Sequence, residues 1–348
     1  MSDCYIIRRG GSQANKLPIL NENYPADIAV WQGDSATFKV EIETQGSPAS
    51  YTYQWYKNGN LITNATMATL NLTGLTTATT ATIYCVVTNK AGDVTSRVAT
   101  LTVKNPNMAY TYDGEHEKID DGSGNWRIKF KSCGTLKFTS LGKWNGKLDV
   151  FCVGGGGSGG GIGFGGGGGY TKTETKDVVE GASYNIIIGA GGAGVAGNAT
   201  VKGNDGGTTS AFGVFANGGQ GGKAWSQQGA GEGSGGGSGG GATGGKNGQA
   251  NVAGGAGGAD GSNGGASQYW SGGTGQGTTT REFGESSYGV YAGGGGGWGS
   301  SAGAGGNGGG GAGDGISGKT NTGGGGGAAN GKTTGAGGSG IVVIRNHR

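Results

Sequence analysis

The sequence has little proline, little charge and no long apolar run, and each shortage excludes a class of protein. Collagen needs abundant proline and a strict Gly-X-Y period, but the four prolines all precede residue 107 and the glycine run at 154–157 breaks any period of three. A formal net charge of +3, with 14% charged residues, is too weak for a nucleic-acid-binding surface. Because no apolar run reaches the length of a membrane span and no signal peptide is visible, we expect neither membrane insertion nor a secretory leader.

Cysteine and histidine are also scarce, which leaves few groups for catalysis or metal binding. The four cysteines, Cys4, Cys85, Cys133 and Cys152, follow no zinc-ligand spacing, so we expect reduced thiols that pack as small apolar side chains. Neither histidine has a nucleophile or carboxylate at a telling position, and the sequence predicts a protein that is not an enzyme and has no cofactor. The acidic segment 113–121 could supply oxygen ligands to calcium, although its spacing departs from the EF-hand loop and also suits a polar turn.

Residues 25–104 contain short strands at regular spacing, which predicts a β-sandwich. Apolar side chains alternate with polar ones in residues 36–42, as they do in a strand with one buried face. Trp55 and Cys85 lie where an immunoglobulin (Ig) domain has its buried tryptophan and the second of its two bridging cysteines, so this segment resembles an Ig-like domain. No cysteine precedes Trp55 within the segment, and we therefore expect an Ig-like domain without the inter-sheet disulfide.

Glycine is what the chain has in excess: there are 91 residues, of which all but 13 follow residue 153. Polyglycine can form the extended threefold helix of the polyproline II type, whose amide and carbonyl groups point outward in three directions. Only glycine lets such helices approach closely enough to bond side by side, and these bonds offset the loss of backbone entropy. We predict a lattice of packed polyglycine II helices rather than a disordered tail, because the strand-like segment 340–345 closes the region.

The expected fold class is all-β: an Ig-like β-sandwich followed by a small β-sandwich that carries the glycine lattice as a large insertion. The alternation of Trp126-Arg-Ile-Lys-Phe, repeated in later segments, predicts the second sandwich. The predicted organisation is an N-terminal attachment segment (1–24), the Ig-like domain (25–104), a linker (105–107) and a glycine-rich domain (108–348), with a strand frame at 108–153, 183–188 and 340–346 and the lattice with its loops at 154–339.

Segments with larger side chains lie between the glycine runs and carry several aromatic residues. A rigid lattice that holds such loops suits a recognition surface. The aromatic rings could equally cap the ends of the lattice and shield its backbone from water. The candidate receptor contacts are Trp225, Tyr269, Trp270, Phe283, Tyr288, Tyr291 and Trp298.

Two stretches match nucleotide-binding patterns within the glycine-rich region. Residues 189–194 match GxGxxG and residues 313–320 match GxxxxGK[ST]. Each kind of site needs a helix directly after the glycines, whose N-terminus meets the phosphate, and no helical periodicity follows either match. Such matches arise by chance in a segment so rich in glycine, and we expect no bound nucleotide.

From Trp126 onward the order of motifs resembles the glycine-rich domain of phage and prophage tail proteins. The resemblance rests on Asp149-Val-Phe-Cys-Val-Gly-Gly-Gly-Gly, Tyr184-Asn-Ile-Ile-Ile-Gly-Ala-Gly-Gly, Thr209-Ser-Ala-Phe-Gly and the closing Gly337-Gly-Ser-Gly-Ile-Val-Val-Ile-Arg. The opening Tyr5-Ile-Ile-Arg-Arg-Gly-Gly, followed by an Ig-like domain, is similar to tail-fibre or baseplate proteins of phages that infect Gram-positive gut bacteria. In related fibre-tip proteins, loops between glycine runs contact the host receptor.

The resemblance implies a virion tail adhesin, made in the host cytoplasm, that binds a glycan or protein of the bacterial surface through loops of the glycine-rich domain. It also implies attachment to other tail or baseplate proteins through the N-terminal segment. A homotrimer would suit a fibre, although no coiled-coil heptad is present. Two alternatives stay open: a structural or decoration component of the tail, and a glycan depolymerase, which needs two acids in one cleft. The acids beyond residue 200 are Asp205, Glu232, Asp260, Glu282, Glu285 and Asp314.

Overall fold

The computed structural model describes residues 14–77, 80–198, 200–224, 280–298 and 302–348. The chain divides into two compact units, residues 1–108 and 109–348, and strands make up nearly all the regular structure of the described residues in both units. The prediction of an all-β chain is therefore confirmed. Among these residues, no helix has the length and apolar character that crossing a membrane requires.

The first unit is an Ig-like sandwich of short strands. Its strands are β1 (Ile19–Leu20), β2 (Ile28–Trp31), β3 (Ala36–Lys39), β4 (Ile42–Thr44), β5 (Thr52–Lys57), β6 (Asn60–Leu61), β7 (Thr69–Leu72), β8 (Ala81–Asn89), β9 (Gly92–Thr95) and β10 (Ala99–Lys104). The main sheet has the order β2-β10-β8-β5-β6, with β9 also paired to β8, and β3 pairs with β7 in a second sheet. In the β5–β8 register Trp55 lies directly opposite Cys85.

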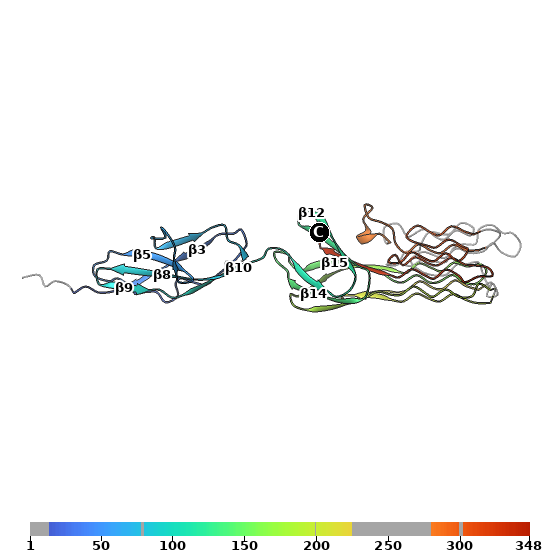
Figure 1. Ribbon diagram of the computed structural model, residues 1–348, viewed down its shortest axis with the longest axis horizontal. Helices are drawn as coiled ribbons and strands as arrows, with labels where there is room; N and C mark the ends of the chain where they lie inside the picture. The colour runs from blue at the N-terminus through green and yellow to red at the C-terminus, as the bar shows by residue number, and fades with distance from the viewer. Residues whose placement is uncertain (1–13, 78–79, 199, 225–279, 299–301) are drawn as a thin grey trace, which may run out of the picture. The chain divides into compact units, whose positions relative to one another are not determined.

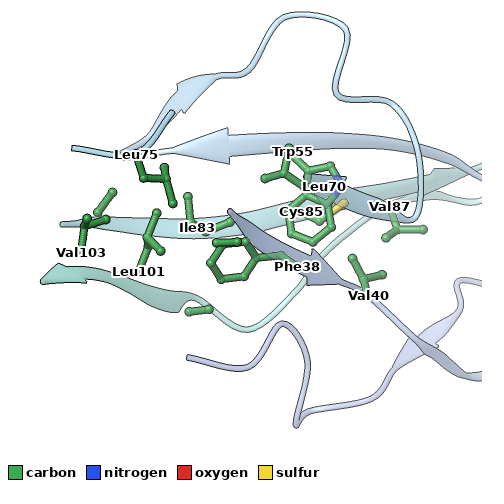
Figure 2. Close-up of a cluster of buried hydrophobic side chains, with 13 residues drawn as sticks. Phe38, Val40, Trp55, Leu70, Leu75, Ile83, Cys85, Val87, Leu101 and Val103 are labelled. Atoms are coloured by element: carbon green, nitrogen blue, oxygen red, sulfur yellow. The ribbon is translucent and has the colours of Figure 1, made fainter. Parts of the chain in front are cut away.

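One cluster of apolar side chains fills the interior of this unit, and Figure 2 shows Trp55 and Cys85 together within it. Trp55, Ile83 and Cys85 have no exposed surface. The indole Nε1 of Trp55 donates a hydrogen bond to the carbonyl of Met67 at 2.9 Å, which satisfies the polar group of this side chain. Cys85 is a free thiol, as predicted, and burial raises its pKa to about 11, so it packs as a neutral apolar group.

The Ig-like unit begins earlier in the chain than the sequence indicated. Lys16 forms a bridge with Ser47, and β1 pairs antiparallel with β4. The side-chain amide of Asn89 also donates to the carbonyl of Lys16 at 2.8 Å. Residues 16–20, predicted as part of an attachment segment, are therefore part of the sandwich, because their backbone pairs with its edge.

The second unit contains two five-stranded sheets. Its strands are β11 (Ala109–Tyr112), β12 (His116–Gly122), β13 (Asn125–Phe130), β14 (Gly134–Ser140), β15 (Lys147–Val153), β16 (Thr171–Asp177), β17 (Ser183–Ile187), β18 (Thr209–Ala211), β19 (Val214–Ala216) and β20 (Ile341–Asn346). One sheet has the order β11-β14-β17-β18-β19 and the other β12-β13-β20-β15-β16. Ile128 and Phe130 of one sheet and Leu136 and Phe138 of the other are fully buried, as their alternation predicts. We call these ten strands the strand frame.

Three strands of the frame, β16, β18 and β19, lie in a region predicted as lattice and loops. The sequence of β16, Thr171-Lys-Thr-Glu-Thr-Lys-Asp, has no apolar residue to mark a buried face. Thr171 of β16 and Thr209 of β18 are nevertheless buried, so a threonine takes one inward position in each of these two strands. β18 and β19 have three residues each, which is too short for a period of two to be recognised.

The chain passes directly from β15 into an extended helix, residues 154–161, that forms the centre of the glycine lattice (Figure 1). Its backbone amides donate in turn to three different neighbouring segments. Every third amide, starting with Gly154, donates to residues 164–170. The amides one position later, of residues 155, 158 and 161, donate to residues 201–207. The amides of residues 156 and 159 donate to residues 335–338, and all these N···O distances are 2.9 Å. A repeat of three residues per turn is the geometry of polyglycine II.

The carbonyl groups of the central helix complete a ring of six neighbours. They accept hydrogen bonds from residues 189–194, 218–222 and 323–327, each at 2.8 Å. Adjacent members of the ring also bond to one another, as Gly207 does to Ala190 at 2.7 Å. The central helix is therefore enclosed by backbone on all sides, and no apolar side chain is needed to exclude water from it.

The lack of side chains is what permits this packing. A Cβ atom on Gly156 would lie inside the contact distance of the Gly324 carbonyl, and a Cβ on Gly157 would meet the Gln220 carbonyl in the same way. Ser158 is the one residue of the central helix that has a side chain, and it is fully buried. Its hydroxyl accepts a hydrogen bond from a backbone amide of the lattice at 2.8 Å. The hydrogen bonds thus agree with the polyglycine II lattice predicted from the glycine runs.

Candidate binding surface

Turns that connect the glycine helices lie at the end of the lattice away from the strand frame (Figure 1). β15 enters the central helix at its first residue, so the turn that follows the helix marks the opposite end. We call this end the distal tip, and define it as residues 161–164, 195–198, 313–316 and 329–334 together with Trp298.

Backbone hydrogen bonds join three turns of the distal tip to one another, and also join Trp298 to one of them. The amide of Ile162 donates to the carbonyl of Ala329 at 2.9 Å, and the amide of Gly331 donates to the carbonyl of Gly197 at 2.8 Å. The amide of Trp298 donates to the turn at 161–164 at 3.0 Å. Segments far apart in the sequence are therefore held together as one surface.

Several polar side chains of the distal tip reach solvent, among apolar ones such as Phe164 and Ala329 that are buried. Lys332 and Asp314 form an ion pair at 2.7 Å, with 51% and 45% of their side chains exposed. Ile316 is 55% exposed, and Asn198 and Thr333 are exposed as well. An ion pair this exposed contributes little to stability, so these side chains are available to a ligand at little cost to the fold.

Of the four predicted receptor contacts that the structure describes, only Trp298 lies at the distal tip. Phe283, Tyr288 and Tyr291 belong to residues 280–291, which we call the folded-back segment because it packs on the strand frame. Its one turn of 3₁₀-helix spans Glu282–Gly284. Trp298 lies at the distal tip and is partly buried. The other three predicted contacts, Trp225, Tyr269 and Trp270, lie outside the described residues.

An ion-pair cluster fastens the folded-back segment to β13. The carboxylate of Glu282 is 1% exposed and accepts hydrogen bonds from Arg127 at 2.5 Å and from Lys129. Tyr291 donates its hydroxyl to the same carboxylate at 2.5 Å. Burial, reinforced by the negative charge of Glu282, raises the pKa of Tyr291 well above its ordinary value, so the hydroxyl remains a donor.

The aromatic rings of the folded-back segment contact the frame, although Phe283 and Tyr288 remain partly exposed. The guanidinium of Arg345 lies 4.2 Å from the ring centroid of Phe283, and that of Arg127 lies 4.1 Å from the ring of Tyr288. Tyr291 is 8% exposed and packs in the apolar cluster of β15 and β20. This burial corrects the placement of Tyr291 on an open loop, and leaves its ring almost no surface for a receptor.

A second charged cluster surrounds Asp149 on β15. Its carboxylate accepts from Arg345 at 2.9 Å and from Thr175 at 2.9 Å, and lies 2.6 Å from Nδ1 of His347. Burial by itself would raise the pKa of Asp149, but the hydrogen bonds from His347, Arg345 and Thr175 outweigh it and hold the pKa below its ordinary value. Arg345 also pairs with Glu285, so this cluster is a further anchor of the folded-back segment.

The acids considered for a depolymerase take part in ion pairs where the structure describes them. Glu282 and Glu285 bind the arginines of the frame, and Asp314 binds a lysine at the distal tip. Asp205 pairs with Lys202 at 3.3 Å and also accepts from a backbone amide at 2.7 Å. The remaining two, Glu232 and Asp260, lie outside the described residues.

Acidic side chains of segment 113–121 also bind other groups of this chain. Asp113 accepts a hydrogen bond from the amide of Thr135 at 2.6 Å, and Asp121 pairs with Arg127 at 3.0 Å. Within the described ranges, no group of three or more His, Cys, Asp or Glu residues is placed to hold a metal ion.

The two nucleotide-like glycine patterns belong to the lattice. Gly192, within residues 189–194, donates to the carbonyl of Gly156 at 2.8 Å. Gly318, within residues 313–320, donates to Ala336 at 2.8 Å. In both stretches the glycines permit close backbone contact, and no helix follows either of them among the described residues.

Comparison with known proteins identifies the family of the glycine-rich part of the chain. A family model described as a glycine-rich domain matches residues 132–347, and the chain belongs to this family. No match was found among curated proteins.

Among solved structures, the chain is similar to the tandem Ig repeats of Dlar, with 18% identity and a TM-score of 0.23, over 26% of this chain and 49% of that one. It is also similar to the N-terminal four Ig domains of Dscam1 isoform 4.44, with 22% identity and a TM-score of 0.21, over 23% of this chain and 19% of that one. The chain thus spans less than half the length of these structures.

Proposed function

We propose that this protein is a phage tail adhesin that binds a glycan or protein on the bacterial host surface through the distal tip of its glycine lattice. The construction of that tip supports the proposal best. Three turns from separate parts of the chain are joined by backbone hydrogen bonds, the fourth is joined to them by the Lys332–Asp314 ion pair, and polar side chains are exposed on this surface. A surface that is already ordered loses little conformational entropy on binding, and loops on a rigid support are common recognition sites.

The proposal places the protein in the virion tail. Its N-terminal segment would attach it to other tail or baseplate proteins, and a homotrimer would present three distal tips in parallel. Multivalent presentation of this kind raises the apparent affinity for a cell surface without any new contact.

A structural or decoration component of the tail is the second candidate. The observation that favours it is the folded-back segment, where Tyr291 is buried and the partly exposed rings of Phe283 and Tyr288 pack against arginines of the frame. In that case the lattice would serve as a stiff spacer, and its exposed end would have no receptor.

The test is binding of the fluorescently labelled full chain to a panel of Gram-positive gut isolates. We expect saturable binding to at least one isolate, weakened about tenfold or more in the double variant Ile316→Asp and Lys332→Glu. The matched control is Phe215→Ser, which changes an equally exposed residue on β19 of the frame. A third variant, with Trp225, Tyr269 and Trp270 changed to alanine, tests the predicted contacts outside the described residues.

The outcomes separate the two candidates. Unchanged binding by the distal-tip variant would remove that surface from the proposal, and loss in the third variant alone would assign binding to the other aromatic residues. A well-folded wild-type chain that binds no isolate would favour the structural role.

A further inference from the structure

A pocket of about 330 Å³ lies at the end of the strand frame opposite the lattice. It is lined by Lys176 and Asp177 at the end of β16, by residues 183–185 at the start of β17, and by Phe212 and Gly213 in the turn between β18 and β19. The other ends of these four strands adjoin glycine helices. The pocket is therefore far from the distal tip, and the proposed adhesin function makes no use of it.

The turn at one side of this pocket has an unusual residue at its first position. Ala211 pairs with Val214, so Phe212 and Gly213 form a two-residue hairpin loop, with φ values of +52° and +76°. Hairpin loops with two positive φ angles favour Asn-Gly. A bulky residue in the left-handed region is strained and persists where the surroundings hold it, often at functional sites.

The ring of Phe212 is held by an aromatic partner. Its centroid lies 4.8 Å from that of Tyr184, with 35° between the two planes. The hydroxyl of Tyr184 in turn accepts a hydrogen bond from the amide of Val179 at 2.8 Å. Two partly exposed rings thus form one apolar wall of the pocket, and that wall is positioned before any ligand arrives.

The polar groups around this wall suit a neutral ligand. Ser183 and Asn185 are exposed, and within the described part of the chain their side chains make no hydrogen bond. Lys176 pairs with Glu174 at 2.6 Å, and Asp177 lies 3.8 Å from Lys147. Because both charges at the rim already have partners, the free hydrogen-bonding capacity is that of a hydroxyl and an amide.

We propose that this pocket binds a neutral hexopyranose unit of an oligosaccharide. A pyranose ring presents an apolar face of C–H groups that packs on aromatic rings, and its hydroxyls pair with hydroxyl and amide side chains. Tyr184 and Phe212 supply the apolar wall, and Ser183 and Asn185 supply donors and acceptors beside it. This site is independent of the distal tip and does not rest on the adhesin function.

The experiment is saturation-transfer NMR of the full chain with maltotetraose, cellotetraose, laminaritetraose and chitotetraose. We expect saturable binding of at least one of them, weakened about tenfold or more by Phe212→Asn. That substitution creates the favoured Asn-Gly loop while it removes the ring, so we expect the melting temperature to stay the same or rise. The matched control Phe215→Ser, on the next strand and outside the pocket lining, is expected to bind as the wild type does.

Three results would overturn the proposal. The first is absence of saturation transfer from wild-type protein to all four sugars, and the second is wild-type binding by Phe212→Asn. The third applies if Phe212→Asn lowers the melting temperature, in which case the exposed Asn185→Ala variant is measured. A loss of sugar affinity of about tenfold in Asn185→Ala supports the site. Unchanged binding in that variant overturns the proposal and assigns Phe212 to packing alone.

Discussion

The two units of this chain exclude water from their interiors in opposite ways. In the Ig-like unit the interior consists of side chains, with Trp55, Phe38 and Ile83 among those that fill it. In the glycine lattice the interior is backbone, because residues 154–161 are enclosed by six other glycine-rich segments at N···O distances of 2.8–2.9 Å. Side chains can change rotamer to absorb a small change in volume, whereas packed backbone has no such freedom. Adding or removing one carbon atom should therefore change the free energy of unfolding very differently in the two interiors.

The largest effect is expected when one carbon is added at the centre of the lattice. In Gly156→Ala the new methyl group meets the carbonyl of Gly324. The backbone fixes the position of the methyl carbon, and the carbonyl is itself backbone, so neither group can rotate away. We expect the second unit to lose more than about 4 kcal/mol of its free energy of unfolding. Amide hydrogen exchange measures this directly: residues 154–161 lose protection, while residues 81–89 in the Ig-like unit keep theirs.

A second glycine provides the matched control. A Cβ atom on Gly289, in the folded-back segment, has no heavy atom within 4 Å, so Gly289→Ala should change stability by no more than about 0.5 kcal/mol. Equal protection in Gly156→Ala and Gly289→Ala would show that the lattice is not packed as tightly as the hydrogen bonds imply.

An intermediate loss of stability is expected when the buried charged cluster around Asp149 is disrupted in the second unit. The pKa of Asp149 is held below its ordinary value despite burial, so its stabilising contribution is present above the unfolded pKa of about 3.9 and is lost as pH falls through the folded value. Asp149→Asn should lower the free energy of unfolding at pH 7 by about 1–3 kcal/mol and flatten its decline in acid. Urea unfolding at pH 7 and in acid measures both.

The control for this charge effect is Asp177→Asn. Its carboxylate is 78% exposed and lies 3.8 Å from its lysine partner, so the change in stability should be close to zero. If both variants show the same pH dependence as the wild type, Asp149 is not the source of the acid sensitivity.

The smallest effect is expected when one carbon is removed from the Ig-like core. Ile83 is fully buried, and Ile83→Val should cost about 1 kcal/mol because neighbouring side chains partly close the gap. Urea unfolding followed by the fluorescence of Trp55 and the other tryptophans measures this. A loss of stability as large as that of Gly156→Ala would mean that the two interiors tolerate a change of one carbon atom equally poorly.

The elements that the sequence predicts well are those whose cause is local. The alternation in residues 36–42 and 126–130 marks buried strand faces, because every second side chain of a strand points the same way. The glycine runs predict the lattice because only residues without a Cβ permit its spacing. The position of Trp55 beside Cys85 follows from the same regular pairing of strands.

What the sequence did not reveal depends on contacts between distant segments. Glu282 and Arg127 are 155 residues apart, and no pattern along the chain connects them, so the folded-back segment was predicted as open recognition loops. β16 was missed because none of its residues is apolar. The pocket beside Phe212 depends on a left-handed turn that a Phe-Gly pair does not ordinarily signal.

The continuity of β15 with the central glycine helix has a mechanical consequence. The hydrogen bonds around residues 154–161 run across the helix axis to six neighbours, so a pull along that axis loads them in shear. For the helix to slide, bonds on all of its sides must break together rather than one after another. A segment with almost no side chains should therefore be stiff and strong under tension, and should pass a force from the distal tip directly into the strands of the frame.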